Sequence, residues 1–425
     1  MIYVPDGSWR RHERVVVAGS PLTIFSLTAA GARVAESIER GEAVRRSTLT
    51  ARLLNAGAIH PVVEQVAARV DLAADVADGA DVTIVTPQLG GIVRTDGRIT
   101  VDDGSRPPLD GAAVRLAVNG GPARARNAAR PLVATEFVAF VDADVDVDRD
   151  GRGPQAWVRS LLGHFDDPSV GLVAPRVLGE PGSSLDMGAE PARVRAGSRV
   201  SYVPTAAVIV RVAALDDVGW FDEQLRFGED VDLVWRLDEG GWVCRYEPAA
   251  AVWHEPRRSL GAMLAQQIDY GGSAAPLAIR HPGALAPLRV NGWTAGACVL
   301  ASTGHVASAA ALALGSAAAL PWKLPDVPAR PAVALALVGH LAASRQLAAA
   351  VRRVWWPLVA LAALRSRRAR FVALIAIAMS PTTALRDGAY GVGVWRGMIR
   401  HRTIEPIVPA ISAWPGRSGR QRAGY

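Results

Sequence analysis

The middle of the chain alternates between short apolar runs and stretches with helical spacing. A short apolar run that ends in a turn or in polar residues predicts a β-strand, and one with every position apolar predicts a strand covered on both faces. Such runs occupy residues 81–87, 98–105, 113–118, 137–141 and 170–175. Because strands that alternate with helices form mostly parallel sheets, residues 79–290 are predicted to form an α/β domain with helices on both faces of the sheet.

The first 78 residues follow a different pattern. Thr28 and Ser47 each precede a stretch with helical spacing. Gly41 and Gly57 follow these two stretches. A hydroxyl side chain before a helix and a glycine after it are common helix boundaries. Residues 1–78 are therefore predicted to form a small winged-helix-like module, and a helical cap without a ligand is the alternative.

The last third of the chain, residues 291–425, is rich in alanine. Residues 294–320 are 27 positions without Asp, Glu, Lys or Arg. A helix of that length is about 40 Å long, which exceeds the apolar core of a bilayer. Residues 331–351 form a second candidate span, and seven arginines fall between 345 and 370. The positive-inside rule then predicts a helical region at the cell membrane, with the preceding α/β domain facing the cytoplasm. A soluble helical bundle is the alternative.

Composition narrows the choice of partners. The net charge is +7, and the arginines crowd the last quarter beside apolar runs, whereas only 6% of the residues are aromatic. This pattern favours a membrane surface and argues against a nucleic-acid partner, which would need stacking side chains. Cys244 and Cys298 can build neither a disulfide framework nor a zinc cluster, which indicates a reducing compartment. Gly19, Ser20 and Pro21 interrupt the only early apolar segment, so no cleaved export signal is expected.

Aspartates crowd the end of the apolar run 137–141. They stand at alternate positions, as Asp142, Asp144, Asp146 and Asp148. Carboxylates this close repel each other unless a cation or solvent relieves them, and hard divalent cations prefer oxygen ligands. In open α/β sheets, ligands bind beyond the carboxyl ends of strands. Asp142 and Asp144 are therefore predicted to hold a divalent cation, Mn²⁺ or Mg²⁺. An acidic turn in a solvated loop is the alternative.

A second acidic pair, Glu229 and Asp230, precedes a stretch with amphipathic helical spacing. Acidic residues suit a helix N-terminus, so plain capping is one explanation. The functional interpretation makes this pair catalytic, with Asp230 as the general base that takes the proton from an attacking hydroxyl.

Two polar turns follow the second and third predicted strands. Asp102 and Asp103 stand in the first turn, where an ordinary Asp-Asp-Gly-Ser turn is the alternative to a binding role. Arg124, Arg126 and Asn127 follow a glycine-rich turn at the start of a predicted helix. Backbone amides and guanidinium groups at such a place bind phosphate, and a solvated basic turn is the alternative.

The segments VTIVTP, VDDGS, NGGPARARN, FVDAD and FGEDVDLVWRL occur in that order along residues 82–237. Together they resemble the motifs of glycosyltransferase family 2 enzymes, which have the GT-A fold. VAPRV (173–177) and YGGSAAPLAIRHPG (270–283), with the N-terminal module, resemble the members of that family in the mycofactocin system. The N-terminal module itself resembles PqqD-like peptide-recognition domains.

The resemblance implies a function. A sugar, glucose by similarity, would move from a UDP-sugar to a hydroxyl of a peptide-derived redox cofactor precursor, with metal dependence and inversion. Pro87, Asp102 and Asp103 would contact the nucleotide, with an aspartate accepting a hydrogen bond from the uracil ring. Asp142 would contact the ribose or the metal, and His254 would be a further metal ligand.

One departure from the family pattern leaves rival interpretations open. Only QLGGIVRTDG separates Pro87 from the second strand, where the family usually has a helix. That helix is predicted to be missing or rudimentary. One rival is a membrane glycosyltransferase that extends a cell-wall polysaccharide or glycolipid. The other is a catalytically silent membrane component that binds sugar nucleotides.

Overall fold

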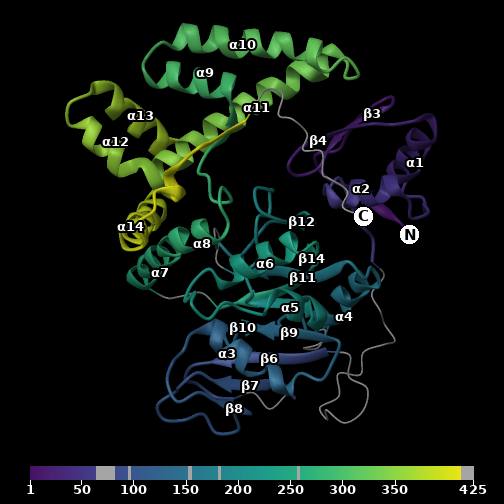
Figure 1. The fold of residues 1–425 in the computed structure, drawn as a ribbon, viewed down its shortest axis with the longest axis vertical. Coiled ribbons are helices and arrows are strands. Elements are labelled where there is room, and N and C mark those ends of the chain that lie inside the picture. The colour runs from purple at the N-terminus through teal and green to yellow at the C-terminus, as the bar shows by residue number, and fades with distance from the viewer. Residues whose placement is uncertain (64–81, 94–96, 152–155, 180–182, 256–258, 413–425) are drawn as a thin grey trace. The chain divides into compact units, whose positions relative to one another are not determined.

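The structure, a computed structural model, consists of two compact units, residues 1–256 and 257–425. It describes residues 1–63, 82–93, 97–151, 156–179, 183–255 and 259–412 (Figure 1). The compact units divide ahead of residue 290, and the three-part division at residues 78 and 290 stays a prediction.

The first 63 residues fold into two small sheets and two helices. The elements are β1 (Tyr3–Pro5), β2 (Arg10–His12), β3 (Val15–Ala18), β4 (Thr23–Ser26), α1 (Ala29–Glu39), α2 (Thr48–Asn55) and β5 (Ile59–Pro61). Strands β2, β3 and β4 form one antiparallel sheet, and β1 pairs with β5. Both helices begin where predicted, because the hydroxyls of Thr28 and Ser47 accept hydrogen bonds from the amides of Gly31 and Thr50.

A nine-stranded sheet forms the core of the first unit, in the order β10-β14-β11-β13-β9-β6-β7-β8, with β12 paired to β14. The strands are β6 (Val82–Gln88), β7 (Ile99–Asp102), β8 (Val114–Arg115), β9 (Phe137–Val141), β10 (Val145–Asp146), β11 (Val170–Leu178), β12 (Ala192–Val194), β13 (Ala207–Arg211) and β14 (Val243–His254). Strands β6, β7, β8, β9, β11 and β14 share one direction, and β10, β12 and β13 run against them. The predicted mostly parallel sheet is thus a mixed one, because β13 lies antiparallel between β9 and β11.

Strand β9 lies near the centre of this sheet, parallel to β6 and antiparallel to β13. Every residue from Phe137 to Val141 is buried, as its continuous apolar run predicts. The helices of the sheet region are α3 (Pro122–Ala128), η1 (Arg130–Leu132), α4 (Ala156–Leu162), η2 (Gly163–Asp166), α5 (Val212–Val218) and α6 (Glu229–Glu239). The residues described between β6 and β7 form no helix, in agreement with the predicted loss of the family's helix.

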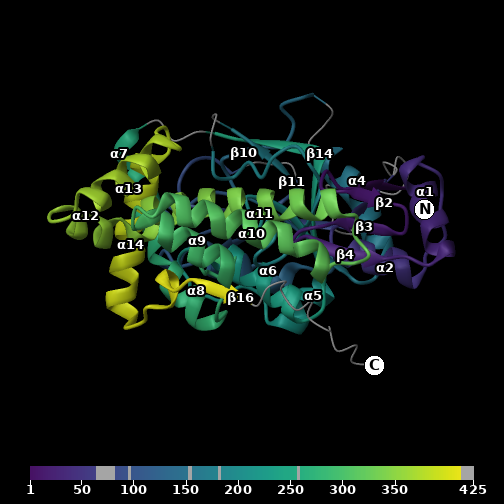
Figure 2. The ribbon, with the colours of Figure 1, turned by 90° about the horizontal axis from the view of Figure 1, so that it is seen from above.

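The second unit is helical. Its elements are α7 (Leu260–Gly272), α8 (Ala274–Arg280), β15 (Arg289–Asn291), α9 (Gly292–Ser302), α10 (Val306–Lys323), α11 (Ala329–Ala350), the π-helical η3 (Val351–Trp355), α12 (Trp356–Ala363), α13 (Arg367–Ala378), α14 (Ala384–His401), η4 (Glu405–Ile407) and β16 (Ala410–Ser412). Strands β15 and β16 pair in parallel. Helix α10 packs against both α9 and α11, and the three lie side by side in Figure 2.

The expectation of one continuous helix over residues 294–320 is wrong. The chain breaks between α9 and α10, where Gly304 adopts a left-handed φ of 88°. The amide of His305 donates to the carbonyl of Leu300 at 2.8 Å, and that of Gly304 donates to Ala301 at 3.0 Å. This pair of bonds is the Schellman helix ending, which a glycine in the left-handed conformation stabilises.

Helices α7 and α14 approach each other backbone to backbone. A Cβ atom built on Gly271 would lie 2.0 Å from the carbonyl oxygen of Tyr390, and one built on Gly393 would lie 2.0 Å from that of Ile268. No side chain fits at such distances, so glycine is required at both positions. The contact joins the first and the last long helix of this unit.

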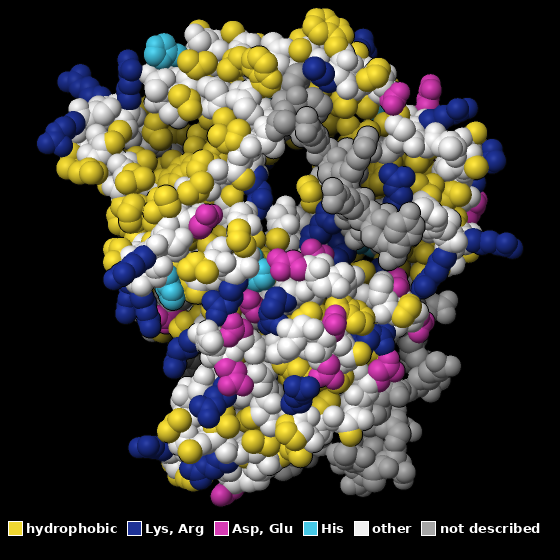
Figure 3. Space-filling model, in the orientation of Figure 1, with side chains coloured by type: hydrophobic (Ala, Val, Ile, Leu, Met, Phe, Trp, Pro, Cys, Tyr) yellow, Lys and Arg dark blue, Asp and Glu magenta, His cyan; other side chains and the backbone are white. Residues whose placement is uncertain are grey.

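Two helical stretches of the second unit are long and apolar enough to cross a membrane: Val306–Lys323, and Ala329–Ala363 including η3. Apolar side chains are also exposed on the neighbouring helices, among them Leu361, Leu364, Phe371 and Leu374. Figure 3 shows hydrophobic side chains gathered over α12, α13 and α14.

Candidate active site

The acidic stretch after β9 is bonded to the chain just before β13 and to the end of β14. The amide of Asp142 donates to the carbonyl of Ala206 at 2.9 Å, which extends the β9–β13 pairing to the first aspartate. Strand β10 then pairs with the end of β14, with Val145 opposite His254. As a result, Nε2 of His254 lies 3.2 Å from Oδ2 of Asp144. Two of the three predicted metal ligands therefore lie in direct contact.

Arg126, on α3, joins the two acidic segments. Its Nη2 donates to Oδ1 of Asp142 at 2.7 Å, and its Nη1 donates to Oε1 of Glu229 at 2.9 Å. The side chain is only 2% exposed, and the ring of Phe221 lies 5.3 Å from the guanidinium carbon. Burial lowers the pKa of Arg126, but the charges of Asp142 and Glu229 outweigh burial and raise it above its ordinary value. Arg126 thus forms a buried bridge between the two acidic segments, and its contact with a nucleotide phosphate stays a prediction.

Glu229 and Asp230 form the first turn of α6. Gly228 precedes them with a left-handed φ of 80°, which turns the chain into the helix. Burial, with repulsion from Asp230, raises the pKa of Glu229 to about 7 against the pull of Arg126. Burial also raises the pKa of Asp230, and the charge of Asp142 adds to this effect. Both carboxylates are therefore stronger bases than exposed ones, which suits a group that must accept a proton.

Asp142 and Asp144 repel each other at the strand end. Burial raises the pKa of Asp142, Arg126 lowers it, and the charge of Asp144 raises it again. A divalent cation would relieve this repulsion, and two carboxylates with the imidazole of His254 are ligand types that suit Mn²⁺. Within the described residues, no group of three or more His, Cys, Asp or Glu side chains is already gathered around one point. The side chains of Asp142, Asp144 and His254 are of the ligand types that a divalent cation prefers. In the structure Asp142 pairs with Arg126, and Asp144 pairs with His254.

The predicted nucleotide-binding aspartates shape two loops at the same edge of the sheet. Asp102 is fully buried and accepts hydrogen bonds from the amides of Ser105 at 2.8 Å and Leu109 at 3.1 Å. Burial raises its pKa, but these bonds outweigh burial and leave the pKa below its ordinary value. Asp103 accepts bonds from the amides of Gly120 at 2.7 Å and Gly121 at 3.0 Å. Asp103 thus fixes the glycine-rich turn that leads into α3.

The remaining predicted residues differ in exposure. Asn127 is engaged with the chain before α6: its Nδ2 donates to the carbonyl of Phe221 at 2.9 Å, and its Oδ1 accepts from the amide of Phe221 at 3.2 Å. Arg124 is exposed, one helical turn ahead of Asn127. Pro87 lies in β6 opposite Val101 of β7. Contact of Asn127, Arg124 and Pro87 with a nucleotide stays a prediction.

The sequence did not predict the hydrogen bonds that Arg236 of α6 makes to the chain before this helix. Nε of Arg236 donates to Oδ2 of Asp232 at 2.7 Å. Its Nη1 and Nη2 donate to the carbonyls of Val218 at 2.5 Å and Trp220 at 2.7 Å. Trp220 has a φ of 61°, unusual for a residue with a side chain, and Arg236 holds the backbone there. The four-residue spacing of Asp232 and Arg236 on a predicted helix was the signal that could have found this pair.

Comparison with known proteins defines the class. Residues 183–383 match the sequence profile of glycosyl transferase family group 2. The chain belongs to glycosyltransferase family 2, and the protein is a glycosyltransferase. It resembles the pre-mycofactocin glycosyltransferase of Mycobacterium tuberculosis (strain ATCC 25618 / H37Rv), with 41% identity over 365 residues that cover 74% of this chain and 76% of that protein.

Other similarities are narrower. The N-acetylglucosaminyl-diphospho-decaprenol L-rhamnosyltransferase of the same strain is 37% identical over 99 residues, which cover 22% of this chain and 31% of that protein. Among solved structures, a mannosyltransferase from Pyrobaculum calidifontis in complex with GDP-Man and Mn²⁺ aligns over 80% of this chain and 91% of its own, with a TM-score of 0.42 and 16% identity.

Proposed function

We propose that the protein is a metal-dependent, inverting glycosyltransferase that moves glucose from UDP-glucose to a hydroxyl of a peptide-derived redox cofactor precursor in mycofactocin biosynthesis. The observation that carries the reaction is the bridge from Asp142 through Arg126 to Glu229, which holds the strand-end carboxylates and the α6 carboxylates in one network. The acceptor rests on the 41% identity to the pre-mycofactocin glycosyltransferase.

Asp230 acts as the general base in this proposal. The acceptor hydroxyl gives its proton to the Asp230 carboxylate while its oxygen forms a bond to the anomeric carbon of the donor sugar. The bond from that carbon to the diphosphate oxygen breaks, and the electron pair leaves with the diphosphate. Because no covalent sugar–enzyme intermediate intervenes, one displacement inverts the anomeric configuration. The raised pKa of Asp230 strengthens it as a base.

The donor lies along the strand ends in this proposal. Asp103 already accepts one amide per carboxylate oxygen, and its remaining lone pairs accept the imide hydrogen of uracil. Pro87 and Asp102 shape the base pocket, Asp142 faces the ribose, and exposed Arg124 at the start of α3 contacts phosphate. Arg126 and Asn127 hold the site in shape. A divalent cation held by Asp142, Asp144 and His254 would stabilise the charge on the departing diphosphate when bound.

In this proposal the N-terminal residues bind the acceptor, and the second unit binds the membrane. Residues 1–78 act as a winged-helix-like module that recognises the peptide-derived acceptor. The second unit binds the cell membrane through its apolar helices, with the catalytic domain on the cytoplasmic side. The exposed side chains of Leu361, Leu364, Phe371 and Leu374 support membrane binding. Serine at these four positions should reduce co-flotation of the protein with lipid vesicles.

One experiment tests the reaction. The purified protein is incubated with a panel of radiolabelled sugar nucleotides and premycofactocin, with Mn²⁺, with Mg²⁺, or with EDTA. Transfer from UDP-glucose that needs a divalent cation and gives a β-linked product is the expected result. Transfer that persists in EDTA would remove the metal from the proposal, and a retained anomeric configuration would remove the single displacement.

A membrane glycosyltransferase that extends a polysaccharide or glycolipid is the second candidate. The exposed apolar surface of the second unit favours it, because a lipid-linked acceptor would be reached from that surface. The full chain offered both acceptors in one reaction discriminates between the two: sugar on the peptide-derived acceptor alone supports the first proposal, and sugar on the lipid-linked acceptor alone supports the second.

A further inference from the structure

A cavity of about 410 Å³ lies in the first unit between the N-terminal residues and the sheet. Its walls come from β1, from α2 and the two residues before it, from the turn that precedes β11, and from the start of β14 with the turn before it. The amide of Arg199 donates to the hydroxyl of Ser20 at 2.6 Å, which ties the N-terminal residues to the sheet region. The volume is within the range of small-molecule sites in proteins. None of the residues proposed for sugar transfer lines this cavity.

Positive charge dominates the walls. Arg46 and Arg245 both line the cavity, and Asp167 is the only carboxylate among the residues that line it. Nη2 of Arg245 lies 3.5 Å from Oδ2 of Asp167, while Oδ1 of Asp167 is engaged by the amide and the hydroxyl of Ser169. One guanidinium charge is therefore offset by Asp167, and the other is left over for a ligand.

Two buried polar atoms in these walls have no partner within the described part of the chain. They are the hydroxyl of Tyr3, on a side chain that is fully buried, and Nε of Arg245, on a residue that is 8% exposed. The two groups are close enough to interact electrostatically. An unpartnered polar atom of this kind costs free energy in the folded protein. A ligand that accepts hydrogen bonds would recover that cost.

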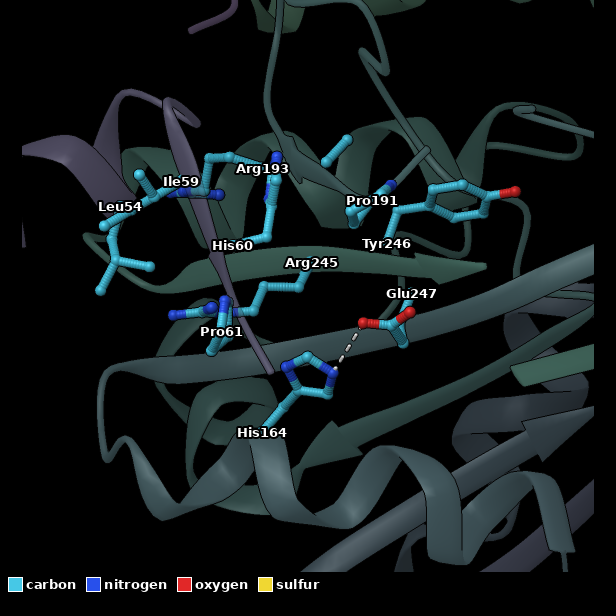
Figure 4. A pocket seen from close by; sticks show the side chains of 11 residues that line it. Leu54, Ile59, His60, Pro61, His164, Pro191, Arg193, Arg245, Tyr246 and Glu247 are labelled. Atoms are coloured by element: carbon cyan, nitrogen blue, oxygen red, sulfur yellow. Dashed lines mark ion pairs between the residues drawn. The ribbon is translucent and has the colours of Figure 1, made fainter. Parts of the chain in front are cut away.

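A smaller cavity of about 10 Å³ adjoins the first and shares Leu54 and Arg245 with it. Figure 4 shows the side chains that line it, among them Leu54, His60 and Arg245. The ion pair of His164 with Glu247 is also drawn, and its Nε2 and Oε2 atoms are 3.3 Å apart. This space holds about one water molecule. Only the larger cavity has room for an organic ligand.

We propose that the larger cavity binds a small organic anion, with its carboxylate or phosphate group held by Arg46, Arg245 and the Tyr3 hydroxyl. Both anion types accept hydrogen bonds from guanidinium and hydroxyl groups. Leu54 and Val243 give the cavity an apolar side, which suits a ligand with a short hydrocarbon body. This second site is independent of the proposed sugar transfer.

Calorimetric titration of the full chain tests the site with three probes: N-acetyl-leucine, its uncharged amide, and inorganic phosphate. At least one of the two anions should bind, and the amide should not. The stronger anion identifies the group that the site prefers. Tyr3→Phe should weaken that anion about tenfold, because it removes a hydrogen bond to a charged group without changing the shape of the ring. Thermal unfolding of the variant checks that it folds.

Arg46→Gln and Arg45→Gln form a matched pair for the same titration. Both arginines are exposed neighbours on the chain, and only Arg46 lines the cavity. Arg46→Gln should weaken the anion several-fold, whereas Arg45→Gln should leave its dissociation constant unchanged. Binding of neither anion to the wild-type chain would overturn the proposal. So would binding that Tyr3→Phe and Arg46→Gln leave intact, or an amide that binds as tightly as the acid.

Discussion

Two polar regions of the first unit are opposite in charge. At the strand ends, the carboxylates of Asp142, Glu229 and their neighbours surround the single buried guanidinium of Arg126. In the N-terminal cavity, the guanidinium groups of Arg46 and Arg245 face the single carboxylate of Asp167. Each region keeps charge of one sign beyond what its internal pairs neutralise, and such an excess is typical of binding sites. The strand ends suit a cation, and the cavity suits an anion.

The two regions also differ in whether their buried polar groups have hydrogen-bond partners. Arg126 donates to both of its carboxylate partners at hydrogen-bond distance, whereas the Tyr3 hydroxyl has no partner in the described residues. The strand-end network is therefore held in place by its own bonds before any ligand arrives. The cavity keeps an uncompensated buried atom that only a ligand or a water molecule can satisfy. The following variants test this contrast.

The largest effect is expected on catalysis. Asp230→Asn removes the proposed base and should lower the turnover rate by a factor of about 10² to 10⁴, with donor binding almost intact. Asp144→Asn should lower the turnover rate as strongly, and unlike Asp230→Asn it should weaken donor binding in the presence of Mn²⁺. Steady-state kinetics and calorimetric binding of UDP-glucose measure both. Normal turnover in either variant would remove the role assigned to that residue.

Next in size is the stability of the strand-end network. Arg126→Met leaves the buried carboxylate of Glu229 and the partly exposed carboxylate of Asp142 without their partner, and it should lower the free energy of unfolding by about 3 kcal/mol. Arg124→Met, an exposed change in the same helix, should alter it by less than about 0.5 kcal/mol. Denaturant unfolding of the two variants measures the difference. Similar stabilities would mean that Arg126 does not hold the two acidic segments together.

A pH dependence follows from Glu229. Its pKa in the folded protein is raised from 4.5 to about 7, so between these values the folded state binds more protons than the unfolded state. The contribution of Glu229 to stability is then fully present below pH 4.5 and is lost as the pH rises towards 7, by up to about 1.4 kcal/mol per pH unit.

Glu229→Gln isolates this contribution. The difference in unfolding free energy between the wild-type protein and the variant should fall with rising pH between pH 5 and 7. Buried His164, whose lowered pKa acts in the opposite direction, cancels in that difference. A pH-independent difference would show that Glu229 is ionised at its ordinary pKa.

The smallest effect is expected in the N-terminal cavity. Without added anion, Tyr3→Phe removes a buried hydroxyl that has no partner, and it should raise the free energy of unfolding by roughly 0.5–1 kcal/mol. Denaturant unfolding in a buffer free of phosphate and carboxylates measures it. A loss of stability would mean that the hydroxyl already has a structural partner, and the contrast with Arg126 would disappear.

The two regions were not equally visible in the sequence. Asp142 and Asp144 follow a buried apolar run, and Glu229 and Asp230 begin an amphipathic helix, so local spacing predicted both elements and their order. Arg126 was predicted as a phosphate contact because the pattern around it is a basic turn. Its burial depends on Phe221 and Glu229, about 100 positions further along, and no local pattern reports a partner at that distance.

The cavity had no sequence signal at all. Tyr3, Arg46 and Arg245 come from three distant segments, and each is ordinary in its own surroundings. The break at Gly304 was missed for another reason. Apolar composition predicts helix and membrane affinity, but the left-handed glycine and its two hydrogen bonds decide where the helix stops. Apolar composition therefore predicts that such a segment is helical, while a single residue such as Gly304 determines where the helix ends.

The close packing of α7 against α14 has a consequence for biosynthesis. Gly271 and Gly393 touch the backbone of the opposite helix, although more than a hundred residues separate them along the chain. The ribosome therefore synthesises helices α8 to α13 before α14, the helix that packs against α7. Those helices must find lipid or a chaperone in the interval, and the final glycine-bearing helix then locks an assembly that is already in place.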